Sequence, residues 1–179
     1  MPCALQYMTR RIRFHRNKLL PVLRFLLLAA LVGGLPAEAG EPAPGFSLPG
    51  NNAQTVSLAA LRGKVVYLDF WASWCQPCRQ SFPWMNSMLK RHADKGLVIV
   101  AVNVDKSREL SDRFLKDMPA QFTIAYDPEG KVASAYKVKG MPSSYLIDRQ
   151  GRLHSSHVGF RSENTAAMES AITSLLQQP

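Results

Sequence analysis

Two cysteines separated by two residues, Cys75 and Cys78, are the residues whose spacing most directly suggests chemistry. They follow an apolar, β-branched run at residues 65–70 and lead into a polar segment that is compatible with a helix. We therefore expect a strand, a turn and a helix in that order, with both sulfurs at the start of the helix. Such an arrangement is typical of a redox site.

The start of a helix favours a negatively charged sulfur, because the first backbone N–H groups have no partner there and the positive end of the helix dipole is close. A thiol in this position loses its proton more readily. Cys75 comes first and is expected to be the exposed nucleophile. Cys78 returns one turn later on the same side of the helix, within reach of the first sulfur, and is expected to be the resolving thiol.

The cysteine count supports a chemical role for this pair. The only other cysteine is Cys3, near the start of the chain. A structural disulfide stabilises a protein mainly by closing a long loop, and a spacer of two residues gives little of that effect. Cys75 and Cys78 are therefore expected to exchange electrons rather than to hold the fold together.

The positive charge of the chain is concentrated at its N-terminus. The 179 residues carry 22 Lys and Arg against 13 Asp and Glu, a net charge of +9. Residues 1–39 hold six of the bases and one of the acids, so the remainder has a net charge of +4. The remainder is long enough for one domain, and its mild basicity does not predict a nucleic-acid partner.

The first part of the chain has the order of a secretory signal peptide. Residues 1–24 are rich in Arg and Lys, residues 25–35 are apolar, and small residues offer a cleavage site after Ala39. An uncleaved membrane anchor is the alternative, and either form predicts a periplasmic location. The chain is accordingly expected to have three parts, which are a signal peptide at residues 1–39, a linker and turn region at 40–54, and a folded domain at 55–179.

The domain itself alternates strand and helix patterns. A helix is predicted at residues 76–91, and residues 97–104 are almost wholly apolar, as expected of a strand covered on both faces. Two such strands joined by a helix form a right-handed βαβ unit, which predicts an α/β fold. The other expected elements are a short strand at 46–48, a helix at 58–61 capped by Ser57, a helix at 108–116, a strand at 122–126, a helical turn at 132–136, a hairpin of 143–148 and 153–158, and a helix from a Ser162 cap to 176 that buries Ala166, Met168 and Ile172.

Several groups of residues match one known superfamily. They are Gly63-Lys64-Val65-Val66, Phe70-Trp71-Ala72-Ser73-Trp74-Cys75, Pro77-Cys78-Arg79, Pro83, Gly140-Met141-Pro142 and Tyr145-Leu146-Ile147-Asp148. On these residues the chain resembles the thioredoxin superfamily, and within it the TlpA-like periplasmic thiol-disulfide oxidoreductases, which include reductases of cytochrome c maturation. The resemblance covers roughly residues 43–176, and the tryptophans and the distant proline make it far more specific than a bare Cys-x-x-Cys.

The resemblance implies a single thioredoxin-like domain with a central mixed sheet flanked by helices, and no cofactor. It also implies protein substrates with disulfides and a membrane electron donor. The reducing direction is favoured, with apocytochrome c or another metalloprotein precursor as the client. Two alternatives remain open, which are a disulfide oxidase and a copper-binding chaperone whose two thiolates bind Cu(I).

Pro142 and Met141 are candidate substrate-binding residues. In the resembled family the corresponding proline is cis and faces the two sulfurs, and the residue before it offers backbone groups to the substrate chain. The alternatives are an ordinary proline at the start of a strand and a core methionine. Trp74 is expected to stay partly exposed as a docking surface, whereas Trp71 is expected to pack the junction of strand and helix.

Asp69 interrupts the apolar strand six positions before Cys75. A carboxylate in such a strand is costly unless it is protonated or paired, which would raise its pKa and suit it to passing a proton to or from Cys78. The alternative is a solvated aspartate that faces the edge of the strand. The position matches the buried aspartate of thioredoxins, whereas TlpA-like proteins commonly have asparagine there. Ser81 departs from the family in turn, because many TlpA-like proteins have glutamate at its position.

Three basic side chains have less specific interpretations. Arg79 could stabilise a thiolate, although an arginine at an exposed helix start usually meets solvent. His154 and His157 could suggest a metal site, but residues three apart on a strand point to opposite faces, and a structural zinc site needs two further ligands. No metal site is predicted.

Overall fold

The computed structural model describes residues 40–51 and 54–178 of the chain. The signal peptide expected at residues 1–39 therefore lies outside the described residues. Among the residues that are described, no helix is long and apolar enough to cross a membrane.

A five-stranded mixed sheet forms the centre of the domain. Its strands are β3 (Val65–Trp71), β4 (Leu97–Asn103), β5 (Thr123–Tyr126), β6 (Ser143–Ile147) and β7 (Leu153–Val158). Their order across the sheet is β5-β4-β3-β6-β7, with β3, β4 and β5 parallel and β6 antiparallel to both β3 and β7. The expected mixed sheet and the expected C-terminal hairpin are both confirmed.

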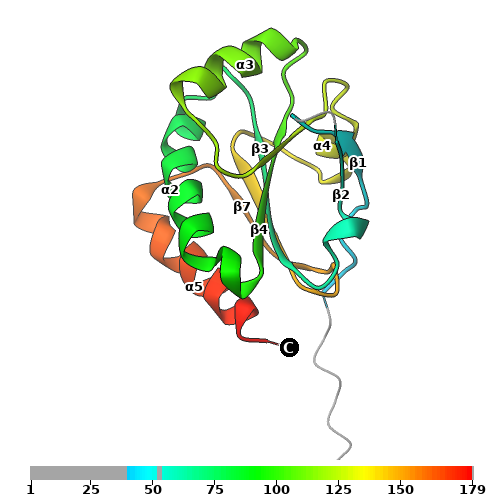
Figure 1. The fold of residues 1–179 in the computed structure, drawn as a ribbon, viewed down its shortest axis with the longest axis vertical. Helices are drawn as coiled ribbons and strands as arrows, with labels where there is room; N and C mark the ends of the chain where they lie inside the picture. The colour runs from blue at the N-terminus through cyan, green and yellow to red at the C-terminus, as the bar shows by residue number, and fades with distance from the viewer. Residues whose placement is uncertain (1–39, 52–53, 179) are drawn as a thin grey trace, which may run out of the picture. The chain divides into compact units, whose positions relative to one another are not determined.

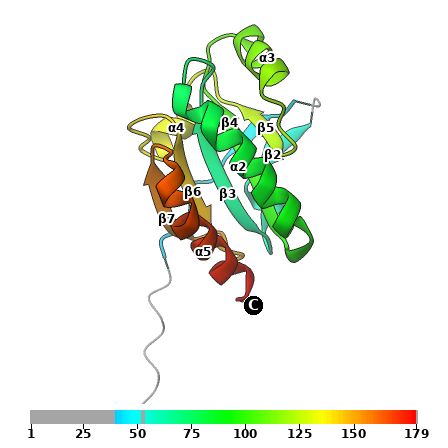
Figure 2. The same ribbon diagram turned by 90° about the vertical axis from the view of Figure 1, so that its left-hand side faces the viewer.

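Helices cover this sheet on both faces. They are α2 (Gln76–His92), α3 (Arg108–Asp117), α4 (Lys131–Ala135) and α5 (Thr165–Leu176). Figure 1 shows α2 and α5 on one side of the sheet and α4 on the other. In Figure 2, turned by 90°, α2 crosses in front of β3, as expected for the helix of a βαβ unit.

The alternation of side chains along β3 divides the core into two parts. Val65, Tyr67 and Trp71 face α2 and α5, and both cysteines belong to the same buried cluster. The intervening residues, Val66, Leu68 and Phe70, face the other side of the sheet, where Tyr136 of α4 also packs. Strand residues that are buried on both faces explain why this segment is apolar almost throughout.

The segment expected as a linker packs against the domain. It forms β1 (Ser47–Pro49), which pairs antiparallel with β2 (Thr55–Ser57), a strand that the sequence did not predict. Phe46 is buried in the core beneath α4, and the chain bridges to the sheet at Pro42 and at Gly50. This short hairpin therefore covers the face of the sheet that α4 leaves open, as Figure 1 shows.

The start of the last helix differs from expectation. Residues Ser162–Asn164 form a 3-10 turn, α5 begins at Thr165, and neither has a side-chain cap. Ile172 is buried as expected, but Ala166 is exposed. Six residues make about one and two-thirds turns of a helix, so Ala166 points away from the face that Ile172 buries.

Candidate active site

Cys75 and Cys78 form a disulfide at the start of α2. The S–S distance is 2.01 Å and the two Cα atoms lie 5.3 Å apart. Cys75 is the N-cap residue of the helix, with an extended backbone, and its Sγ accepts a hydrogen bond of 3.2 Å from the backbone N–H of Cys78. The sulfur of Cys75 thus occupies the position where a helix start favours negative charge.

The two sulfurs differ in their access to solvent. Cys75 is 3% exposed and Cys78 is fully buried. Cys75 is therefore far less exposed than the sequence suggested, because the cluster beneath α2 buries most of it. It is nonetheless the only one of the pair with any exposed surface.

A buried carboxylate holds the loop that carries Cys75. Asp105, which follows β4, accepts hydrogen bonds from the backbone N–H of Ser73 at 2.9 Å and from its hydroxyl at 3.0 Å. The amide of Asn103 donates to the same carboxylate at 2.8 Å. The sequence analysis missed this contact. The available signal was an acidic residue just after a buried strand parallel to β3. Parallel neighbouring strands have their C-terminal ends side by side, so residues that follow them can meet.

The peptide bond between Met141 and Pro142 is cis, as the family resemblance implied. Ser143, the next residue, pairs with Phe70 near the C-terminal end of β3. Pro142 therefore lies at the end of the sheet where the chain leaves β3 toward Cys75. Its carbonyl accepts a 2.7 Å hydrogen bond from the N–H of Gly159. Met141 is half-buried and packs against the cluster that contains both cysteines.

Two tryptophans near the cysteines have opposite environments. Trp71 is fully buried and packs edge-on against Phe82, with ring centroids 5.0 Å apart. Trp74 is 71% exposed and precedes Cys75 directly. A large apolar side chain in solvent beside a reactive sulfur is suited to contact with a partner.

Arg79 turns away from the disulfide. Its guanidinium lies 5.0 Å from the centre of the Phe114 ring and 3.6 Å from a carboxylate oxygen of Asp117. Ser81 is buried and donates a 3.1 Å hydrogen bond to the carbonyl of Cys78. Neither side chain offers an acid or a base to the sulfurs.

Asp69 is buried inside the sheet. It is 1% exposed, and its Oδ2 has no hydrogen-bond partner among the described residues. Burial raises the pKa of this carboxyl well above its usual value. Asp69 lies two residues from both Tyr67 and Trp71 along β3, so it faces the same layer as Cys78. A carboxyl in that layer can hold or release a proton on the same side of the sheet as Cys78.

The two histidines of β7 lie on different sides of the sheet. His157 lines a pocket with Tyr67 and Met168, whereas His154 lies beside Tyr145, which belongs to the other part of the core. Within residues 40–51 and 54–178, no three His, Cys, Asp or Glu side chains form a group that could hold a metal ion.

Comparisons with known proteins agree with this geometry. The AhpC/TSA family matches residues 39–156. The thiol-disulfide oxidoreductase ResA of Bacillus subtilis is 35% identical to this chain over 125 residues, which is 70% of this chain and 70% of that protein.

Solved structures with the same fold include one protein that is 50% identical to this chain and one that is 30% identical. One is from Chlorobium tepidum and is assigned as a thiol:disulfide interchange protein, DsbE. It has a TM-score of 0.75 and 50% identity, and covers 78% of this chain and 98% of its own. The other is the exposed lipoprotein thioredoxin Etrx1 of Streptococcus pneumoniae, with a TM-score of 0.63 and 30% identity over 76% of this chain and all of its own.

The buried carboxyl of Asp69 makes stability depend on pH. Because the folded state has the higher pKa, both states are protonated below about pH 3.8, the usual value. As the pH rises above that value, the unfolded chain ionises first. The free energy of unfolding should then fall by about 1.4 kcal/mol per pH unit until the pH passes the pKa of the folded state.

Asp69→Asn removes this ionisation. The free energy of unfolding of the variant, relative to that of the natural protein, should therefore increase with pH. Urea unfolding of the oxidised protein between pH 4 and pH 8 measures the difference. The exposed Asp94→Asn is the matched control. Parallel pH curves for the Asp69→Asn variant and the natural protein would show that the carboxyl is not held in an apolar site.

Proposed function

This chain belongs to the AhpC/TSA family and, within the thioredoxin superfamily, to the TlpA-like thiol-disulfide oxidoreductases, and on that premise we propose that it reduces disulfides of protein clients outside the cytoplasm. It is a protein-disulfide oxidoreductase of the thioredoxin type. The observation that carries the proposal is the position of Cys75, whose sulfur caps α2 and is bonded to Cys78.

The reaction proceeds by two exchanges. In the reduced protein the Cys75 thiolate attacks a client disulfide, which forms a mixed disulfide and releases one client sulfur as a thiolate. Cys78 then loses its proton and attacks the sulfur of Cys75. The bond between Cys75 and the client breaks, the Cys75–Cys78 disulfide forms, and the client leaves as a dithiol after taking up protons from water.

Asp69 is proposed as the group that accepts the proton of Cys78. Both residues face the layer between the sheet and α2, and Cys78 is too buried to give its proton directly to solvent. A general base must have a proton affinity near that of the acid it serves, and the raised pKa of Asp69 moves it in this direction. Asp69 therefore supports the resolving step rather than the first attack.

The electrostatic surroundings of Cys75 support the reducing direction. A protein is a strong oxidant when its reduced form is stabilised, chiefly through the thiolate. Here the sulfur accepts one backbone hydrogen bond, and the nearby guanidinium of Arg79 is engaged with Phe114 and Asp117. An ionised Asp69 would oppose a second negative charge. The thiolate is therefore stabilised by the helix start but by no neighbouring cation, which is less than a strong oxidant provides, so the disulfide form of this protein is favoured and electrons pass to the client.

The proposed client is apocytochrome c or another metalloprotein precursor whose paired cysteines must be reduced before the metal group is attached. Trp74 supplies an exposed apolar surface next to Cys75, and Met141 lies beside the same cluster, so a client strand would pass between them. The signal-like leader, and the likeness to an exposed lipoprotein, support a periplasmic or membrane-anchored location. A membrane protein is the proposed electron donor.

Cys78→Ser should trap the mixed disulfide, because Cys75 can still attack the client disulfide but no thiol at position 78 can then displace the client sulfur. We expect this variant, mixed with an oxidised Cys-x-x-Cys-His peptide, to form a covalent adduct through Cys75 that dithiothreitol releases. Mass spectrometry of the non-reduced product measures it. Cys75→Ser is the matched control and should form no adduct. Absence of an adduct, together with one-to-one Cu(I) binding, would favour the copper chaperone instead.

The direction of electron flow is measured by equilibrating the protein with glutathione buffers of known ratio. We expect a reduction potential nearer to the value of about −270 mV for thioredoxin than to the value of about −120 mV for the oxidant DsbA. A potential at the DsbA end of this range would assign the protein as an oxidase, with the cysteine chemistry otherwise unchanged.

A further inference from the structure

Three polar residues lie side by side across the sheet. Asp69 of β3 is paired with Ser144 of β6, and Ser144 is paired in turn with His157 of β7. Directly paired residues point to the same face of a sheet, so all three side chains lie on the face covered by α2 and α5. The row leads from the fully buried centre of the sheet to its edge, where His157 is half-buried.

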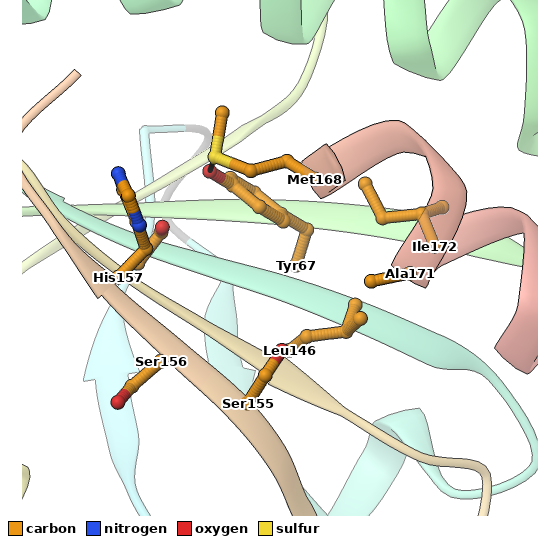
Figure 3. Close-up of a pocket in the computed structure, with 9 residues that line it drawn as sticks. Tyr67, Leu146, Ser155, Ser156, His157, Met168, Ala171 and Ile172 are labelled. Atoms are coloured by element: carbon orange, nitrogen blue, oxygen red, sulfur yellow. Dashed lines mark hydrogen bonds between the residues drawn. The ribbon is translucent and has the colours of Figure 1, made fainter. Parts of the chain in front are cut away.

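A small pocket lies beside the outer two residues of this row, Ser144 and His157, between the sheet and α5. Its volume is about 30 Å³, and Ser144, His157 and Tyr67 are among its lining residues. Figure 3 shows the imidazole of His157 and the ring of Tyr67 rising from the sheet on the same side, toward the helix that carries Met168. A water molecule needs at least about 10–15 Å³ and two to four polar partners, and this pocket offers both.

Few other titratable groups face the row. From β3 comes the phenol of Tyr67, which burial keeps protonated by raising its pKa, and whose hydroxyl lies 3.8 Å from the sulfur of Met168. The 3-10 turn before α5 contributes Asn164, whose amide nitrogen is 3.3 Å from Nε2 of His157. α2 contributes Cys78. Burial raises the pKa of the Asp69 carboxyl, and the charge of Asp69 helps to raise the pKa of the Tyr67 phenol.

If Asp69 takes the proton of Cys78, it can return that proton only when the disulfide is reduced again, and regaining the carboxylate before then requires exchange with solvent, although the carboxyl is 1% exposed. We propose that Ser144, water in the adjacent pocket and His157 form the route by which Asp69 exchanges protons with solvent. This inference rests on the proposed function. Ser144 and His157 do not touch the sulfurs, so they are positioning residues that act through Asp69.

Each turnover moves one proton along this route and changes no bond other than those to hydrogen. The Cys78 thiol gives its proton to the Asp69 carboxylate, and the resulting thiolate attacks Cys75 as described above. The carboxylic acid then passes its proton through the hydroxyl of Ser144 and pocket water to a ring nitrogen of His157. The imidazolium releases it to bulk water, and the carboxylate is restored.

Multiple-turnover reduction of an oxidised Cys-x-x-Cys-His peptide, with a dithiol present to reduce the protein again, tests the route. A positioned acid or base contributes about 10²–10⁴-fold to a rate, so a carboxyl that cannot lose its proton between turnovers should lower the turnover rate by at least about tenfold. We expect this loss in Ser144→Ala and in His157→Gln. Added imidazole should restore the rate of His157→Gln, because it can replace the missing side chain at the surface.

His154→Gln is the matched control, since it makes the same change on the same strand at the other face of the sheet, and it should react at the natural rate. Infrared spectroscopy provides a second readout. After transfer to D₂O, the carboxyl band of Asp69 should shift more slowly in Ser144→Ala and His157→Gln than in the natural protein.

Unchanged turnover rates and unchanged deuterium exchange in both variants would overturn the route. A loss in His157→Gln that imidazole does not restore would overturn it too, because a purely structural defect behaves in this way. In either case the Cys78→Ser adduct would still form, so the oxidoreductase function would stand. Failure of that adduct would instead remove the proposed function itself.

Discussion

The backbone N–H groups at the start of α2 need acceptors, and the sulfur of Cys75 provides one. The N–H of Cys78 donates to it at 3.2 Å, at the end of the helix where partial positive charge accumulates. Much of the surrounding structure serves to keep the sulfur there. β3 brings the chain to this edge of the sheet, Asp105 holds the loop at Ser73, and Pro142 comes to the same edge from β6.

A second constraint arises from burial. The cluster beneath α2 makes Cys78 inaccessible, which would protect a resolving thiol but also separates its proton from water. In the proposed mechanism the Asp69 carboxyl accepts this proton and exchanges it along the polar row that ends at His157. That role would give a reason for a serine and a histidine in a layer that is otherwise largely apolar.

Local patterns predicted most of this fold, because strands buried on both faces and an amphipathic helix leave distinct periodicities. The helix start at Cys75 and the burial of Trp71 follow from residues close in sequence. The cis peptide before Pro142 depended instead on family resemblance. Asp105 and the row through Ser144 were not predicted, since both depend on strand pairing between segments far apart in the chain. For Asp105 the position just after a buried strand was an available signal, whereas the pairing of Ser144 with Asp69 and His157 leaves no pattern in the sequence. β2 was missed because three residues are too few to display an alternation.

The proposed thiol-disulfide exchange depends most on the charge state that the helix start gives to Cys75. Alkylation of this thiol by iodoacetamide in the Cys78→Ser variant, followed as a function of pH with mass spectrometry to identify the modified cysteine, measures it directly. We predict that the reactivity of Cys75 rises with pH and reaches half its maximum at a pH clearly below about 8.5, the pKa of a free cysteine. A midpoint at or above that value would contradict the claim that α2 activates this sulfur.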